Sequence, residues 1–174
     1  FQKIPIDKLS TVSFSSGGKK ILLSNLSGRV LIWDLKSESI ILEEEAAPNI
    51  VPKWSPDEKS LLLPNIKNNE SALVNIKTKE KIILKHGSNV HNIASFSPDG
   101  TKILTLTRGD LAFNVWDIQT AKVAYRLQHS LGPHSSSHNN QQSSKWWHAA
   151  GTFSPDGNRI ITFSDDMTVK LWDS

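Results

Sequence analysis

The sequence contains no cysteine in its 174 residues. Disulfide bonds, cysteine nucleophiles and thiolate metal sites are therefore excluded. Long hydrophobic runs are also absent: stretches such as 21–23 and 61–63 are far shorter than the ~20 residues of a transmembrane helix. Phe1 is not followed by a basic and then apolar leader. We therefore expect a processed chain or an excerpt of a longer protein.

A large excess of charge of one sign is absent as well. The 20 basic and 17 acidic residues give a net charge of +3, spread along the chain. This small excess favours solubility over nucleic-acid binding, so we expect neither a membrane nor a nucleic-acid partner. No segment has a 3.6-residue apolar period, which argues against helices.

The motifs of several enzyme classes are missing. The chain has no GxGxxG, HExxH or GxSxG. Gly18-Lys19 resembles the end of a phosphate-binding loop, but Ser13 replaces its first glycine and Lys20 its Ser or Thr. Asp165-Asp166 is interpreted as part of a turn rather than a catalytic pair. We expect no enzyme and no cofactor in these residues.

What the sequence does contain is a repeat. Four segments align on the aromatic anchors Phe14, Trp54, Phe96 and Phe153, which are separated by 40, 42 and 57 residues. The first two separations match the ~40–45-residue period of a four-stranded propeller blade, and the third contains an insertion. Nineteen or twenty residues after each anchor begins one of four pairs: Trp33-Asp34, Val74-Asn75, Trp116-Asp117 and Trp172-Asp173.

Each repeat has the pattern of short strands separated by turns. Ser-Pro-Asp-Gly at 97–100 and 154–157 predicts turns, because Pro fixes φ and Asp-Gly tolerates left-handed backbone. β-Branched and apolar runs of strand length flank these turns. We predict strands at 103–106, 160–163 and 169–172, and fourth strands at 40–42, 82–84 and 123–127.

The segments "FSPDG" followed by "VKLWD" or "FNVWD" resemble the WD-repeat β-propellers, and the resemblance covers nearly the whole chain. It implies an all-β fold of four four-stranded antiparallel blades, at about 7–45, 46–87, 88–130 and 146–174. The Trp-Asp pairs would have structural roles. Asp110 and Asp166 match the aspartate of a four-member polar network that joins such blades. No clean Gly-His dipeptide is present, only the reversed His86-Gly87, so we expect this network to be incomplete in most units.

The number of blades leaves several alternatives open. Residues 1–6 resemble the missing outer strand of the last blade, where Pro5 suits a sheet edge, or they belong to a preceding blade. Four blades lie at the low end of the ~4–8 found in propellers. We expect an excerpt of a larger ring. The alternatives are a half-ring that self-associates to eight blades and a four-blade ring.

The resemblance implies that one rim collects the links into each first strand and the turns between second and third strands. Residues 131–145 form a low-complexity insertion in this rim, which we expect to be disordered and to end in the aromatic Trp146-Trp147. The acidic run 43–45 is interpreted as a solvated loop, although it could attract a basic peptide. The predicted partner-binding residues are Trp146, His91, His148, Arg108 and Asp110.

Histidines allow other interpretations. His91 and His148 could be satisfied structural histidines rather than contacts. His129, His134 and His138 have spacings loosely compatible with zinc, with His148 as a fourth ligand, but no cysteine or carboxylate accompanies them. We expect no metal site.

These features predict a protein–protein interaction scaffold that binds a peptide or protein on the loop-rich rim. The alternative is a regulatory or substrate-gating module of a larger multidomain enzyme or nucleotide-switched assembly. A sugar or small-ligand binder would need pocket residues repeated in each blade, whereas the loops differ in every unit. We expect an intracellular, cytoplasmic protein.

Overall fold

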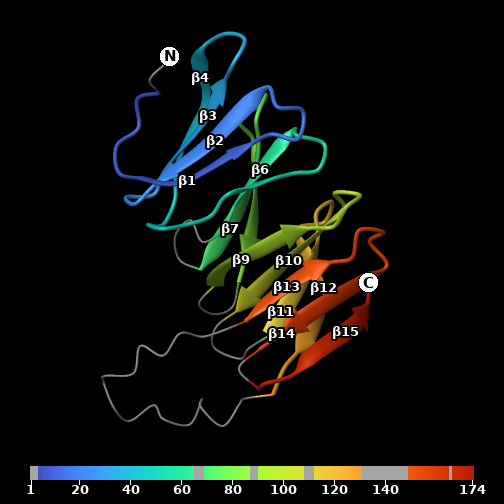
Figure 1. Ribbon diagram of the computed structural model, residues 1–174. Helices are drawn as coiled ribbons and strands as arrows, with labels where there is room; N and C mark the ends of the chain where they lie inside the picture. The colour runs from blue at the N-terminus through green and yellow to red at the C-terminus, as the bar shows by residue number, and fades with distance from the viewer. Residues whose placement is uncertain (1–3, 65–68, 87–89, 108–111, 131–148, 165) are drawn as a thin grey trace, which may run out of the picture. The chain divides into compact units, whose positions relative to one another are not determined.

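The computed structural model describes residues 4–64, 69–86, 90–107, 112–130, 149–164 and 166–174. The chain divides into two compact units, Phe1–Gly87 and Ser88–Ser174. Fifteen strands form four antiparallel sheets in these described ranges, and each sheet follows the order of the chain (Figure 1). None of the described residues forms a helix of the length and apolarity needed to cross a membrane.

The first unit contains two four-stranded sheets. In both, the second and third strands are rich in Leu, Ile and Val and are the most buried, because both of their faces are covered. The strands are β1 (Leu9–Phe14), β2 (Lys20–Asn25), β3 (Arg29–Asp34), β4 (Ser39–Glu45), β5 (Lys53–Trp54), β6 (Ser60–Leu63), β7 (Glu70–Asn75) and β8 (Lys81–Lys85).

The second unit contains one four-stranded and one three-stranded sheet. The strands are β9 (Val90–Phe96), β10 (Lys102–Thr107), β11 (Ala112–Asp117), β12 (Lys122–Gln128), β13 (Ala150–Phe153), β14 (Arg159–Phe163) and β15 (Val169–Asp173). Every strand predicted from the repeat lies within one of these elements. The all-β class and the succession of antiparallel blades are therefore confirmed, with three strands in the last sheet.

The turns between first and second strands follow the chemistry predicted for Ser-Pro-Asp-Gly. In the third sheet the Ser97 hydroxyl donates to Asp99 Oδ1 at 2.6 Å, and Gly100 adopts a φ of 71°. The bonds from Ser97 and from the Thr101 amide lower the pKa of Asp99 to about 2. The turns at 55–58 and 154–157 contain the same serine-to-aspartate bond.

The residues that close the third strands stabilise the next turn. Asp34 and Asp117 accept hydrogen bonds of 2.8–3.0 Å from backbone N–H groups two or three residues later. Asn75, which replaces the aspartate in the second repeat, accepts the equivalent bonds at 2.9 Å. The amide oxygen of Asn75 therefore stabilises the turn in the same way as a carboxylate oxygen. Asp173, at the end of β15, pairs in register with Arg159.

Each unit has one apolar core between its two sheets. In the first unit, Leu22, Val30, Ile32 and Leu42 of the first sheet pack with residues of the second sheet, Leu61, Leu63, Ala72 and Val74. In the second unit, Leu104, Leu106, Phe113, Val115 and Leu127 pack with Phe153, Ile160 and Trp172.

Residues 4–6 lie against the first sheet. Ile4 and Ile6 pack on a small cluster of Leu23, Leu31 and Trp33. The use of this segment as the outer strand of the last blade and its membership of a preceding blade both stay predictions.

Candidate functional site

In each unit, the links into the first strands and the turns between second and third strands share one edge, which we call the loop edge. In the first unit, the Leu26 amide donates to the Lys8 carbonyl at 2.9 Å, and the Ala46 amide donates to the Gly28 carbonyl at 2.9 Å. Gly28 is required here: its φ is 96°, and a Cβ would lie 2.1 Å from the Ala46 carbonyl oxygen.

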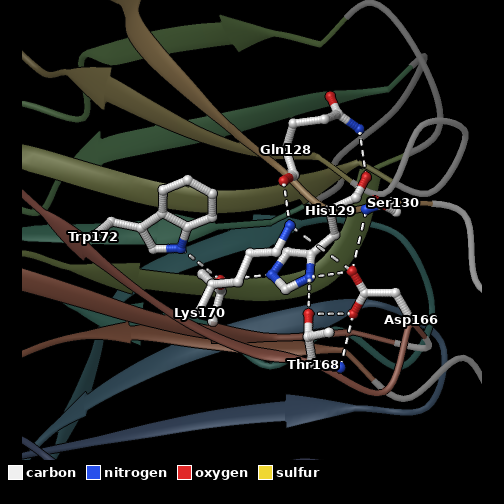
Figure 2. Close-up of polar contacts among 8 residues, drawn as sticks. Gln128, His129, Ser130, Asp166, Thr168, Lys170 and Trp172 are labelled. Atoms are coloured by element: carbon white, nitrogen blue, oxygen red, sulfur yellow. Dashed lines mark hydrogen bonds and ion pairs between the residues drawn. The ribbon is translucent and has the colours of Figure 1, made fainter.

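A buried polar network forms the loop edge of the second unit (Figure 2). His129 follows β12, and its Nδ1 lies 3.0 Å from Asp166 Oδ2 in the β14–β15 turn. Its Nε2 lies 2.7 Å from Thr162 Oγ1 on β14. The same hydroxyl accepts a 2.8 Å bond from Trp172 Nε1 on β15. The network therefore joins the link that enters the last sheet to two of its strands.

The donors and acceptors define the direction of two of these bonds. The indole of Trp172 can only donate and the ionised Asp166 can only accept. Trp172 therefore donates to Thr162, and His129 Nδ1–H donates to Asp166. The Thr162 hydroxyl is in this way bonded to both rings.

Asp166 also binds the backbone at two places, at Ser130 after β12 and at Thr168 in its own turn. Its carboxylate accepts bonds from the Ser130 amide at 3.1 Å and from the Thr168 amide and hydroxyl at 3.0 and 2.7 Å. Burial alone would raise the pKa of Asp166, but the bonds from Thr168 and His129 outweigh it and hold that pKa far below its usual range. The turn is therefore anchored by a carboxylate that stays ionised.

Neighbouring side chains enclose His129. The imidazole makes edge contacts with Phe113 and Trp172, at centroid distances of 5.9 and 6.3 Å. Lys170 Nζ bonds the Gln128 carbonyl at 3.1 Å and lies 3.9 Å from Asp166, so a cation closes the outer side of the network (Figure 2).

The first and second sheets contain less of this network. In the first sheet Leu23 stands where Thr162 stands in the last, and Trp33 Nε1 is buried without a hydrogen-bond partner among the described residues. The second sheet places the apolar Leu63 and Val74 at these positions. The third retains the bond from Trp116 Nε1 to Thr105 Oγ1, at 2.8 Å. The first and second sheets therefore lack a complete network, whereas Asp110 of the third sheet lies outside the described residues.

Two hydrogen-bonded turns present apolar side chains to solvent at the loop edges. In the first unit, Asn25 Oδ1 accepts bonds from the Ser27 and Arg29 amides and so holds the turn that exposes Leu26. In the second unit, Met167 is 81% exposed on the turn held by Asp166. Apolar contacts are thus available on backbone that is already ordered.

His129 is one of four histidines whose spacing is loosely compatible with zinc, and both of its ring nitrogens are engaged, by Asp166 and Thr162. The other three, His134, His138 and His148, lie outside the described ranges. The sequence obscured the role of His129 because the insertion separates it from Phe153, whereas His86 stands only ten residues before Phe96. Subtracting the 15 residues of the insertion places His129 nine residues before Phe153, within one residue of the position of His86. Among the described residues, no group of three His, Cys, Asp or Glu could hold a metal ion.

The predicted partner-binding residues are not tested by this geometry. His91 lies on β9, but its side chain is outside the described residues. The remaining members also lie outside the described ranges, as does the 131–145 insertion: Trp146, His148, Arg108 and Asp110. They stay predictions.

The acidic run 43–45 is not a loop, as the sequence suggested, but the end of β4. Glu43 pairs with Arg29 at 2.7 Å, and Glu44 pairs with Lys81 at 2.5 Å. Two of the three carboxylates are therefore occupied by cations of the chain itself.

Comparison with known proteins agrees with the repeats. The family described as "WD domain, G-beta repeat" matches residues 128–173, a range that contains the whole His129 network. The chain is 22% identical over 156 residues to WD repeat-containing protein sll1491 of Synechocystis sp., which covers 88% of this chain and 40% of that protein. It is 26% identical over 167 residues to WD repeat-containing protein SL1-17 of Schistosoma mansoni, or 94% and 50% of the two chains. The chain thus spans half or less of the length of these relatives. Residues 128–173 match a WD repeat, and the chain with its four repeated sheets is similar to WD-repeat proteins.

Proposed function

We propose that the chain is a protein-binding scaffold that captures a peptide or protein at its loop edges. WD repeats generally mediate protein–protein interaction, and the family is typically non-catalytic. The observation on which the proposal rests is the Asp166 turn, which holds the exposed Met167 on ordered backbone.

Binding at such a turn requires little reorganisation. Ordering a loop on binding costs free energy, whereas a turn that is already hydrogen-bonded has lost that freedom on folding. An exposed methionine suits this role because its flexible, polarisable side chain adapts to different partners. Leu26 offers a similar contact in the first unit. Trp146, His91, His148, Arg108 and Asp110 remain the proposed polar and aromatic contacts.

The test selects peptides on the whole chain from a displayed random library and then measures their binding to variants. Met167→Asp, Leu26→Asp and the pair Trp146→Ala with Arg108→Ala should each weaken binding, because they remove apolar or aromatic anchors. Unfolding temperatures should not change, since Met167 and Leu26 are exposed.

The control is Gln119→Asp, which introduces the same charge in the exposed β11–β12 turn at the opposite edge. Its binding should equal that of the unmodified chain. The proposal would be overturned if peptide binding did not change with any of the loop-edge substitutions. It would also be overturned if Gln119→Asp abolished peptide binding.

A further inference from the structure

The turn between β1 and β2, at 15–18, lacks an acceptor that the equivalent turns contain. In each of the other three sheets, the serine that opens this turn donates to an aspartate two residues later, at 2.5–2.7 Å. In the first sheet Gly17 stands at the aspartate position, so Ser15 has no such acceptor. Ser15 is only 3% exposed, and its hydroxyl has no hydrogen-bond partner among the described residues. A buried hydroxyl is normally bonded, so this turn has a donor available for a further acceptor.

A carboxylate from the second sheet takes the place of the missing aspartate. Glu58 Oε1 accepts bonds from the Ser16 hydroxyl and the Gly17 amide. Its Oε2 lies 3.7 Å from Lys20 Nζ. The bonds from Ser16 and Gly17 lower the pKa of Glu58, and the Ser15 hydroxyl lowers it too, so this hydroxyl lies beside the same carboxylate. Two hydroxyls, one backbone amide and one ammonium group therefore face a single oxyanion.

The position of Glu58 allows its carboxylate to be replaced by another anion. Its φ of 57° lies in the left-handed region, which is unfavourable for a residue with a side chain and is occupied by Gly100 and Gly157 in two other turns. The Glu58 side chain is 19% exposed, and residues 16–18 are exposed too, so dissolved anions reach the donors. A Cβ placed on Gly18 would have no heavy atom within 4 Å. The turn thus has open space beside it for a group larger than a carboxylate.

We propose that the 15–18 turn, with Lys20, is a binding site for an external oxyanion, a phosphate or carboxylate group that displaces the carboxylate of Glu58. Hydroxyls, backbone amides and lysine are donors with which proteins bind such groups. Phosphate has more oxygens than a carboxylate and can bond the Ser15 hydroxyl in addition to the donors that Glu58 uses. We therefore expect phosphate to bind more tightly than a carboxylate. The inference does not depend on the loop-edge proposal, because this turn lies at the opposite edge of its sheet.

An NMR titration of the isotope-labelled whole chain tests the site, with the Gly17 amide as the reporter. Sodium phosphate replaces sodium chloride at constant ionic strength. Glu58→Gly frees the donors and should fold, because glycine favours the φ at this position. Its Gly17 signal should shift to saturation, whereas the unmodified chain should need about tenfold more phosphate, since its tethered carboxylate competes. Glu58→Gln, which keeps the side chain but not its charge, should also respond at lower phosphate than the unmodified chain.

A parallel titration with sodium acetate distinguishes the two kinds of oxyanion. Half-saturation of Glu58→Gly at lower phosphate than acetate is the expected result. The reverse order would also support an oxyanion site and would identify a carboxylate as its ligand.

The matched control is Glu45→Ala, which removes one exposed carboxylate of the same unit without freeing the turn. Its titration should match that of the unmodified chain. Adding Ser16→Ala or Lys20→Met to Glu58→Gly should abolish most of the response. An unchanged Gly17 signal in Glu58→Gly, or a response that survives both added substitutions, would overturn the proposal.

Thermal unfolding gives a second measurement that needs no resonance assignment. Phosphate stabilises folded proteins in general, so the observable is the difference between variants. A ligand that binds only the folded state raises the unfolding temperature. Phosphate should therefore raise that of Glu58→Gly more than that of the unmodified chain or of Glu45→Ala. Equal increases in all three chains would contradict the site.

Discussion

At the scale of single residues, the Thr162 hydroxyl links two ring nitrogens, one of His129 and one of Trp172. Thr162 Oγ1 lies 2.7 Å from His129 Nε2 and 2.8 Å from Trp172 Nε1. Without it, both rings would keep a buried nitrogen with no partner. The cost of leaving a buried polar group unsatisfied is about 1–3 kcal/mol.

Thr162→Val keeps the shape of the side chain and removes the hydroxyl. We expect the free energy of unfolding to fall by roughly 2–4 kcal/mol, because two nitrogens lose their bonds. Urea unfolding measures the change. Thr152→Val, on the exposed opposite face of the sheet, should alter stability by less than about 0.5 kcal/mol. Equal effects of the two substitutions would show that the Thr162 hydroxyl contributes no more to stability than an exposed hydroxyl does.

His86 gives the fold a dependence on pH. It is buried, with Nε2 3.0 Å from Ser71 Oγ, and burial lowers its pKa from 6.5 to about 4. Between these values the unfolded chain binds more protons than the folded chain, so stability falls as pH decreases through this window. Carboxylates titrate mainly below it.

We therefore expect His86→Gln to lessen the loss of stability between pH 7 and pH 4.5. The difference should be on the order of 1–3 kcal/mol, because each pKa unit corresponds to about 1.4 kcal/mol. Urea midpoints at the two pH values provide the measurement. An unchanged pH dependence in the variant would place the acid sensitivity elsewhere.

At the scale of elements, one turn is completed by its neighbour. The first repeat has Gly17 where the other repeats have Asp57, Asp99 and Asp156. In the turn of the next sheet, Glu58 occupies the position of Gly100 and Gly157, at a φ of 57°. Its carboxylate accepts bonds from Ser16 Oγ and the Gly17 amide and lies 3.7 Å from Lys20. The missing acceptor is thus supplied from the adjacent sheet.

A double-mutant cycle tests this exchange. Glu58→Gly should destabilise because the first turn loses its acceptor. Gly17→Asp alone should also destabilise, since a Cβ at that position lies 3.4 Å from Glu58 Oε1 and the two carboxylates repel. The double variant restores the ordinary pattern, so the two effects should be coupled by about 1–2 kcal/mol. Purely additive effects in urea unfolding would contradict this account.

At the scale of the whole molecule, the sequence predicted the sheets better than the contacts between residues. The Ser-Pro-Asp-Gly turns and Trp-Asp pairs locate strands because each contains its own local chemistry. Glu58 and Ile4 act on a neighbouring element instead, and no local pattern marks such a contact. The role of His129 in the polar network was not predicted, because the insertion changed its spacing to Phe153. Glu43 and Glu44 appeared free because their cations, Arg29 and Lys81, are distant in sequence.

The central claim is that partners bind at the loop edges, and hydrogen–deuterium exchange on the whole chain tests it most directly. The probe is a peptide selected on the chain from a random displayed library. Bound peptide should slow exchange at 25–28, 46–52 and 166–168, where links and second turns meet. Protection confined to the opposite turns, at 15–18, 97–100 and 154–157, would contradict the account.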